Sequence, residues 1–324
     1  QGSAPDSRQA RAGGDPRTRS RHTHAALHYA PSIYGIMYVK IDDFAHRLSF
    51  FFNSHMDFFE EIGKYRAARR IWANKLKNDY GAKNENSLKL KFHTQTAGCS
   101  LTAQQPENNI IRTAYEAMSA VLGGTNSLHT NSLDETLALP SEKAAKIALR
   151  TQQILALETG VPNVADPLGG SWYVEEITDR IEDEANEYFK AIKSLGGTIV
   201  AIEDGYFQKK IAESASLYQE SIDSKERIIV GVNDFVDKDE KLEIEILKIS
   251  QQAQEIQEKK IKELREKRDN KLLDKKMKKL RNACENNLNL VPCLIEVAEH
   301  GGTVGEIVEL MKSVYGEWEE SFGI

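Results

Sequence analysis

The sequence predicts an α/β protein in which parallel strands alternate with helices, followed by a mainly helical region. Short apolar or alternating runs at 48–52, 88–93 and 127–130 are typical of strands. Stretches with apolar residues at three-to-four spacing separate these runs and are typical of helices. The order strand–helix–strand–helix–strand favours parallel pairing with right-handed crossovers. Residues 141–324 carry mostly helical patterns.

The composition excludes several classes of protein. The 324 residues are 40% hydrophobic and 28% charged, which fits one large or two modest globular domains. No run reaches about 18 consecutive apolar residues, so we expect no membrane-spanning helix. Cys99, Cys284 and Cys293 are scattered, which argues against a disulfide scaffold or a cysteine zinc site and favours a reducing, cytoplasmic compartment. The net charge of −6 argues against nucleic-acid binding by the chain as a whole.

Residues 1–32 differ from the rest of the chain. They contain few large aliphatic side chains and cannot bury enough apolar surface to offset chain entropy, so we predict that they are disordered. Arginine-rich leaders can be mitochondrial transit peptides, but Pro5 and Pro16 interrupt any helix and an apolar face is missing. A non-native or mis-translated leader is the favoured interpretation. Its removal is expected to change stability by no more than about 0.5 kcal/mol.

The alternating region contains five elements in order. Residues 48–52 (LSFFF) form a short run with the length and aromatic content of a strand, and residues 58–72 show helical spacing. Residues 88–93 (LKLKFH) alternate as a half-buried strand does. A helix is predicted over 108–122, and a third strand over 127–130.

The helical region begins with an amphipathic stripe over 144–155, followed by a strong turn signal at 166–171 (DPLGGS). A helix is predicted over 175–194, with Gly196 and Gly197 ending it. Residues 228–233 (IIVGVN) predict a short strand or a buried extended segment.

Residues 257–282 carry twelve Lys/Arg and five Asp/Glu, which predicts one long charged helix. A solvated helix with pairs such as Glu263–Lys267 is favoured over a nucleic-acid or anionic-lipid patch, because aromatic residues for base stacking are absent. Farther on, Thr303 is expected to cap a helix whose Glu306 completes a capping box.

Polar side chains gather at the ends of the three predicted strands. Arg47 and Ser49 flank the first strand. The second closes with His93, Thr94, Gln95 and Thr96. The third carries polar residues from Asn126 to Asn131. In a parallel barrel, ligand-binding groups lie at the carboxyl ends of the strands, so the three strands are expected to form one polar rim. A single histidine is more often a hydrogen-bonded structural residue, and that interpretation stays open. Nucleotide-binding, zinc-protease and nucleophile-elbow motifs are absent.

Eight stretches then resemble one family, in the same order along the chain. They are 47–52 (RLSFFF), 93–98 (HTQTAG), 100–104 (SLTAQ), 108–113 (NNIIRT), 123–131 (GGTNSLHTN), 133–135 (LDE) with 138–140 (ALP), 166–171 (DPLGGS) and 230–233 (VGVN). The chain from about residue 41 onward resembles the cobalamin-dependent acyl-CoA mutases, whose best-known member is methylmalonyl-CoA mutase. The departures include Asn126, Thr136 and His46, where the family usually has Gln, Ala and Pro.

The resemblance implies a partial (β/α)8 barrel of TIM type. Residues 33–175 would be the C-terminal half of the barrel of a large, catalytic subunit, and 176–324 a helical linker or subunit-contact region. The family's earlier strands, which carry its substrate-selecting residues, and its cobalt-ligating motif have no counterpart in the resembling stretches. The implied partners are an acyl-CoA substrate and a separate cobalamin-binding small subunit or domain, in an oligomer without nucleic acid or membrane.

The implied function is an isomerase reaction. With adenosylcobalamin, the family carries out a radical 1,2-rearrangement such as the interconversion of methylmalonyl-CoA and succinyl-CoA. One alternative is a mutase for another branched acyl-CoA, such as isobutyryl- or 2-hydroxyisobutyryl-CoA. The other is a non-catalytic half-barrel fragment or accessory subunit.

Site residues follow from the resemblance by position. Arg47 and Ser49 would contact coenzyme A, and His93 would be catalytic and lie at the thioester or substrate. The corrin ring would be faced by four residues, namely Gln95, Gly98, Glu135 and Leu139. No metal ligand is expected.

Two physical arguments accompany these assignments. Neutral donors such as His93 and Gln95 suit a reaction in which the cofactor makes the radical and the protein shields it from water. These two residues lie two positions apart on an extended segment, so their side chains share a face. We expect that face to point to the barrel axis, with Ser49 and Ser127, and away from the helices.

Overall fold

The computed structural model describes residues 40–237, 239, 244, 246–247 and 250–318. The segment predicted to be disordered, 1–32, lies outside the described residues. The chain forms two compact units, each considered by itself. Of the described residues, the first unit contains 40–136 and 142–187, and the second contains 137–141 and those from 188 to 318.

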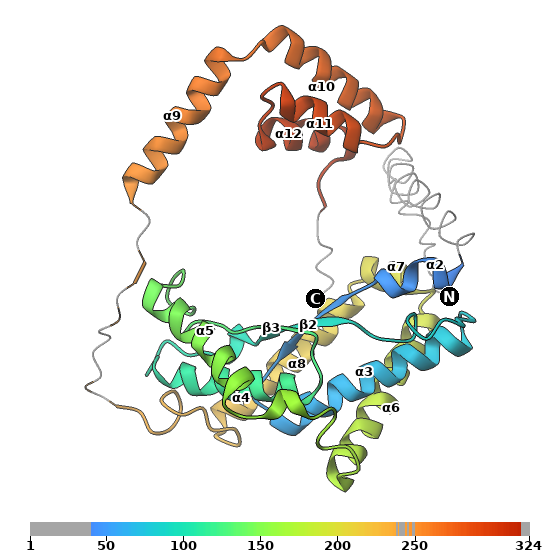
Figure 1. Ribbon diagram of the computed structural model, residues 1–324, viewed down its shortest axis with the longest axis vertical. Helices are drawn as coiled ribbons and strands as arrows, with labels where there is room; N and C mark the ends of the chain where they lie inside the picture. Colours follow the sequence, from blue (N-terminus) through green and yellow to red (C-terminus); the bar gives the residue numbers. More distant parts are fainter. Residues whose placement is uncertain (1–39, 238, 240–243, 245, 248–249, 319–324) are drawn as a thin grey trace, which may run out of the picture. The chain divides into compact units, whose positions relative to one another are not determined.

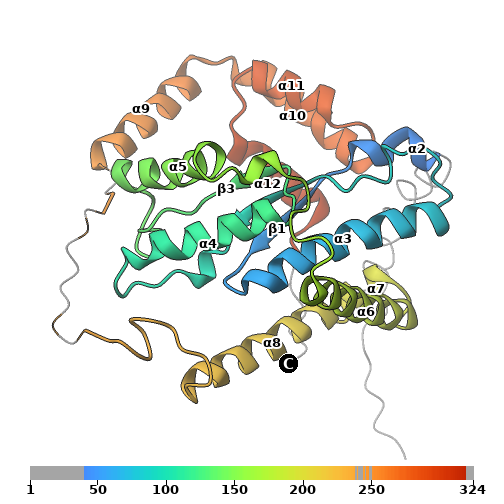
Figure 2. The same ribbon diagram turned by 60° about the horizontal axis from the view of Figure 1, so that its bottom comes forward.

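The first unit is built on a three-stranded parallel sheet (Figure 1). Its strands β1 (Phe50–Ser54), β2 (Phe92–Thr96) and β3 (Ser127–His129) lie in sequence order. The crossover helices are α3 (Phe58–Asn78) and α4 (Asn108–Leu122), which pack against each other on one face of the sheet (Figures 1 and 2). This arrangement confirms the α/β class and the parallel pairing, and it fits a partial barrel of TIM type.

The strands begin later than the sequence pattern predicts. Before β1 the chain forms the short helices α2 (Ile41–Phe44) and η1 (Ala45–Arg47), so 88–91 has no neighbouring strand to pair with. Pairing starts where the N–H of Phe50 donates to the carbonyl of Lys91 (2.9 Å). The alternation in 88–91 comes instead from Leu88 and Leu90, whose side chains pack among helix-facing residues without strand pairing.

Aromatic rings fill the space between the sheet and α3. The ring of Phe92 stacks on Tyr65 at 5.2 Å between centroids and meets Phe52 edge-on at 5.3 Å. Phe50 meets Trp72 edge-on at 5.0 Å. Such pairs contribute about 0.5–1.5 kcal/mol each beyond the burial of apolar area. They fix which face of the sheet the helices cover.

Helix α6 (Trp172–Ser194) closes the outer side of α3. Gly63 permits the close approach, because a Cβ there would lie 2.8 Å from Cγ2 of Ile177. The guanidinium of Arg66 donates to Asp166 at 3.1 Å and to Glu175 at 2.7 Å, which joins α3 to the predicted turn at 166–171. The remaining elements of this unit are α5 (Glu142–Leu157), which packs on α4, and the 3-10 turns η2 (Gly98–Ser100) and η3 (Val161–Asn163).

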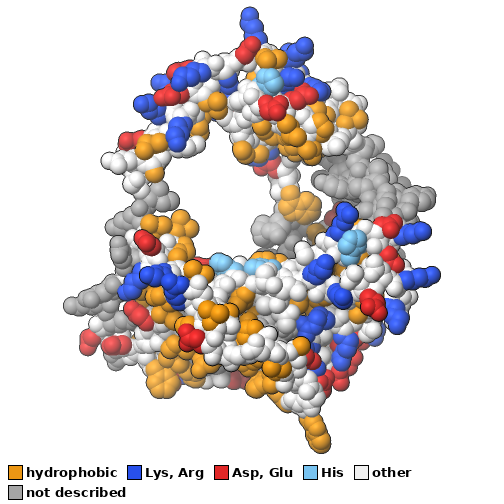
Figure 3. All heavy atoms as spheres, in the orientation of Figure 1, with side chains coloured by type: hydrophobic (Ala, Val, Ile, Leu, Met, Phe, Trp, Pro, Cys, Tyr) orange, Lys and Arg blue, Asp and Glu red, His pale blue; other side chains and the backbone are white. Residues whose placement is uncertain are grey.

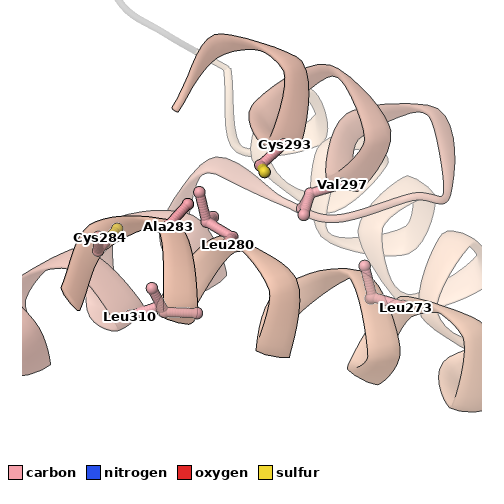
Figure 4. Packing of buried hydrophobic residues seen from close by; sticks show 7 residues of the cluster. All are labelled: Leu273, Leu280, Ala283, Cys284, Cys293, Val297 and Leu310. Carbon is pink, nitrogen blue, oxygen red and sulfur yellow. The ribbon is translucent and has the colours of Figure 1, made fainter. Parts of the chain in front are cut away.

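The second unit is helical in its described residues. Its elements are α7 (Thr198–Glu203), α8 (Tyr206–Asp223), α9 (Gln251–Lys267), α10 (Asn270–Glu285), α11 (Val291–Glu299) and α12 (Val304–Tyr315). Helices α10, α11 and α12 enclose a small apolar core that includes Leu280 and Val297 (Figure 4). The capping box of Thr303 and Glu306 is present as predicted. The glycines that end α6 also stand where the sequence placed them.

Two expectations in this unit are wrong. The charged stretch 257–282 is two helices, because Asp269 caps the start of α10 by accepting from the N–H of Leu272. Helix α9 has no buried residue and contains the ion pair Glu263–Lys267 at 3.4 Å, as expected of a solvated helix. Residues 228–233 form a turn, because the side chain of Asn233 bonds to the N–H of Ile229 and to carbonyls of two earlier residues. In the described parts of the chain, no helix has the length and apolar character needed to cross a membrane.

Candidate active site

The two faces of the sheet differ sharply. In the register, His93 stands beside Phe51 and Ser127, and residues paired in this way point to the same side of a sheet. Thr94, the next residue of β2, points to the other side and is fully buried against the helices, whereas Phe51 is 59% exposed. The face that carries His93 and Gln95 is therefore open, and histidine side chains are visible at the surface over β2 and β3 (Figure 3). The prediction that His93 and Gln95 point away from the helices, on the face of Ser127, is confirmed.

His93 is held from both sides on this open face. Its Nδ1 lies 2.7 Å from the hydroxyl oxygen of Ser127, and its ring centroid lies 5.2 Å from that of Phe51. These contacts use one ring nitrogen and fix the plane of the imidazole. Among the described residues no partner is recorded for Nε2, so this nitrogen can meet a ligand.

Gln95 occupies the next row toward the carboxyl ends of the strands. The register places it between Asn53 and His129 on the same open face. Its side chain is half-buried. This row offers neutral amide and imidazole groups, which can form hydrogen bonds without carrying a full charge.

A polar network occupies the carboxyl edge of β2. The hydroxyl of Thr96 donates to Oδ1 of Asn131 at 3.0 Å and accepts from the N–H of Asn131 at 2.9 Å. The Asn131 amide nitrogen donates to Oε1 of Glu135 at 3.1 Å. A Cβ on Gly98 would lie 3.0 Å from that amide nitrogen and 3.3 Å from Oε1 of Glu135. The structure thus brings together Gly98 and Glu135, two of the residues predicted to face the cofactor, around Asn131.

The loops beyond this edge are fixed by a second asparagine. Asn109 is fully buried at the start of α4. Its amide nitrogen donates to the carbonyls of Thr102 and Leu133, and its Oδ1 accepts from the N–H of Thr102 and from Arg112. The two loops that follow β2 and β3 are therefore tied to one side chain. This rigidity preserves the geometry of the edge.

The single polar rim predicted from all three strands is wrong for Arg47 and Ser49. Arg47 ends η1 and Ser49 precedes Phe50, so both lie before β1, at the amino edge of the sheet. Both side chains are exposed. Both residues precede β1 in the sequence, so in a parallel sheet they lie at the edge opposite the carboxyl ends of the strands. Leu139 is exposed and belongs to residues 137–141 of the second unit.

The structure makes two further residues prominent: Asn131, which the sequence analysis counted only among the polar residues of the third strand, and Glu116, to which it gave no role. Asn131 anchors the network described above. Glu116 is fully buried on the helix-facing side of the sheet, and burial raises the pKa of its carboxyl to about 8. A signal for Glu116 was available, because Thr113, Ala117 and Ala120 at helical spacing mark its side of α4 as the buried one.

The chain matches one protein family and several known proteins. The family described as methylmalonyl-CoA mutase matches residues 24–317. The chain is 44% identical over 284 residues to the 2-hydroxyisobutanoyl-CoA mutase large subunit of Aquincola tertiaricarbonis, covering 87% of this chain and 50% of that protein. It is 43% identical to the methylmalonyl-CoA mutase of Rhizobium meliloti, covering 86% and 39%. It is 42% identical to the mitochondrial methylmalonyl-CoA mutase of Homo sapiens, covering 86% and 37%. The chain spans half or less of the length of these relatives.

Proposed function

Because this chain belongs to the methylmalonyl-CoA mutase family, an intramolecular mutase family, we propose that it forms the substrate- and cofactor-facing half of an acyl-CoA mutase barrel. The observation that carries the proposal is the open face of the sheet. It presents His93 on Ser127, then Gln95, then the Gly98–Asn131–Glu135 edge, in one direction along the strands. An interior barrel face would hold a ligand along this line.

We propose that His93 acts on the acyl group. Its Nδ1 is engaged by Ser127, so its Nε2 can donate a hydrogen bond to a thioester carbonyl. Phe51 beside the ring excludes water from one side. The imidazole holds the carbonyl without adding or removing a full charge.

We propose that the carboxyl edge holds adenosylcobalamin. The edge fits a flat ligand, because Gly98 carries no side chain and a Cβ there would meet Asn131 at 3.0 Å. Gln95 offers a neutral amide group near that edge, and Glu135 is oriented by the buried Asn131 amide. When bound, this cofactor supplies the radical that starts the rearrangement. The residues of this chain bind, orient and exclude water.

We propose that Arg47 and Ser49 bind coenzyme A from the opposite end of the sheet. A guanidinium pairs well with phosphate oxygens, and Arg47 is exposed. In the register His93 stands beside Phe51, the second residue of β1, so His93 lies toward the same end of the sheet as Arg47. A long substrate could then reach from a phosphate at Arg47 to a thioester near His93.

Two substrate classes remain candidates. The relatives named methylmalonyl-CoA mutase and the relative named 2-hydroxyisobutanoyl-CoA mutase match at similar identity, so we propose methylmalonyl-CoA first and a branched hydroxyacyl-CoA second. The second relative is named a large subunit, which favours a separate cobalamin-binding subunit as partner in an oligomer. We also propose a cytoplasmic location.

The test is a reconstituted enzyme. The chain is fused to the preceding barrel half of a relative, supplied with adenosylcobalamin and a cobalamin-binding subunit, and offered methylmalonyl-CoA, isobutyryl-CoA and 2-hydroxyisobutyryl-CoA in parallel. Turnover of one of them supports the proposal. Which acyl-CoA is turned over reports the relative's half of the fusion, because the earlier strands carry the substrate-selecting residues. Correctly folded fusion protein without turnover of any acyl-CoA would leave the non-catalytic alternative.

A further inference from the structure

The first observation is a carboxyl group buried without a partner. Glu116 of α4 has no exposed surface, and neither of its carboxyl oxygens has a hydrogen bond among the described residues. The hydroxyl of Thr113, one turn earlier on the same helix, is also buried without a partner. An ionised carboxylate is very costly in such a place, whereas a neutral carboxylic acid is tolerated.

The surroundings of Glu116 explain its protonation. Burial raises the pKa of its carboxyl to about 8, and the negative charge of Glu61 on α3 adds to the rise. The Ser100 hydroxyl and the Ala97 N–H lie near the carboxyl, but they donate to the carbonyls of Ala97 and Ser54. Together with the Arg112 charge they lower the pKa and offset only part of the rise. Tyr65 also faces this region from α3, where its hydroxyl donates to Asn53 and Glu61. The acid is therefore largely protonated below pH 8.

The second observation is what lies around this acid. Ser100 and Ala97 belong to the turn that leads from β2 into η2, and this turn carries Gly98. The turn is held by three backbone hydrogen bonds, from Ala97 to Ser54, from Ser100 to Ala97 and from Leu101 to Gly98. Ser54 in turn donates to the carbonyl of Glu116 at 2.8 Å. The buried acid and the Gly98 turn thus form one structural unit.

We propose that Glu116 is a positioning residue: the Ala97–Leu101 turn, and with it the Gly98 edge, keeps its place only while this buried carboxyl stays neutral. Loss of its proton puts an unpaired charge under the turn and opens it to water. The role at the cofactor edge rests on the proposed function. The coupling between Glu116 and the turn does not.

The experiment is hydrogen exchange of the full chain between pH 6 and pH 8, corrected for intrinsic exchange rates. We expect protection of the Ala97, Ser100 and Leu101 amides to fall roughly tenfold or more, because opening releases a carboxyl that then ionises freely. Glu116→Gln keeps a neutral amide of the same size, so its protection should stay within about twofold over this range. Glu107→Gln, an exposed change at the start of the same helix, is the matched control and should behave as the parent.

Three results would overturn the inference. One is equal protection of the parent turn at pH 6 and pH 8. Another is an equal fall in the protection of the turn amides between pH 6 and pH 8 in Glu116→Gln. If Glu116→Gln does not fold, the glutamate carboxyl groups of the parent chain are titrated by carbon-13 NMR. The inference is contradicted if every one of them titrates below pH 6. Failure of the fusion enzyme to bind cobalamin, with the exchange behaviour as expected, would instead contradict the proposed function.

Discussion

At the residue scale, the site depends on alternation along β2. His93 and Gln95 face the open side, while Thr94 and Thr96 between and after them face the helices or the edge network. His93 and Gln95 have different neighbours on this face. Ser127 and Phe51 fix His93, whereas Gln95 lies one row nearer to the Gly98 edge.

This difference in neighbours predicts different effects of two alanine substitutions in the fusion enzyme. His93→Ala removes a preoriented donor and should raise the barrier to turnover by about 2–4 kcal/mol, with a smaller effect on cobalamin binding. Gln95→Ala should weaken cobalamin binding more than it slows turnover. Turnover, cobalamin affinity and melting temperature are measured on both variants. If both residues are merely structural, each variant melts earlier and the surviving folded enzyme turns over at the parent rate.

Gly98 gives a second residue-scale prediction. Gly98→Ala places a Cβ 3.0 Å from the Asn131 amide nitrogen, so Asn131 and Glu135 must shift. We expect a loss of about 1–3 kcal/mol in unfolding free energy, the usual cost of overpacking, together with weaker cobalamin binding by the fusion enzyme. The control is Gly305→Ala, where a Cβ meets no atom within 4 Å. Equal stability of the two variants would show that Asn131 and Glu135 can shift without a cost in unfolding free energy.

At the element scale, helix α12 depends on one glutamate with two tasks. Glu306 accepts from Arg268 at 2.6 and 2.8 Å and also accepts from the N–H of Thr303, which is the N-cap. The Arg268 guanidinium is the main reason that the pKa of Glu306 falls to about 2. The start of α12 is thereby joined to the end of α9, where Arg268 is the C-cap.

A pH dependence follows from this lowered pKa. The charged form is the stabilising one, so its contribution is full above about pH 4.5 and is lost as the pH falls toward 2. Glu306→Gln should cost about 1–2 kcal/mol at pH 7, reduced by partial solvent exposure, and almost nothing at pH 2. Unfolding at both pH values, followed by exchange of the α12 amides, measures this. Glu309→Gln, one turn along on the exposed surface, serves as control, and an equal effect there would rule out a special role for the Arg268 pair.

At the scale of the whole molecule, the sheet of the first unit is incomplete. β1 and β3 each have one neighbour among the described strands, so each leaves an unpaired edge, and Phe51 is exposed on the open face. Unpaired edges and exposed aromatic residues favour pairing with further strands. The matched region covers half or less of the relatives' length, so the relatives contain further chain that can form such strands.

The fusion with the preceding barrel half should therefore protect these edges. We expect slower exchange of the β1 amides, less binding of a hydrophobic dye and a higher melting temperature of the first unit than in the chain alone. The exchange of α12 provides an internal reference in the second unit. Unchanged β1 exchange in a soluble, folded fusion would contradict the half-barrel interpretation.

How much of the fold could be predicted from the sequence depends on the range of the interactions that form each element. Helices α3, α4 and α5, the Thr303 capping box and the glycines after α6 follow from periodicity and capping, which act over a few residues. The alternation in β2 likewise placed His93 and Gln95 on one face, because side chains on a strand alternate whatever surrounds it. The long motifs identified the family for the same reason, since they are continuous along the chain.

Tertiary structure decided everything that depends on which partner a segment meets. The segment 88–91 alternates like a strand but stays unpaired, because the chain before Phe50 turns into η1. The partners of Asn131, and the buried environment that keeps Glu116 neutral, arise from contacts between β2, α4 and the loops that follow. Burial and long-range hydrogen bonds exist only once the chain has folded, so they remained invisible in the sequence.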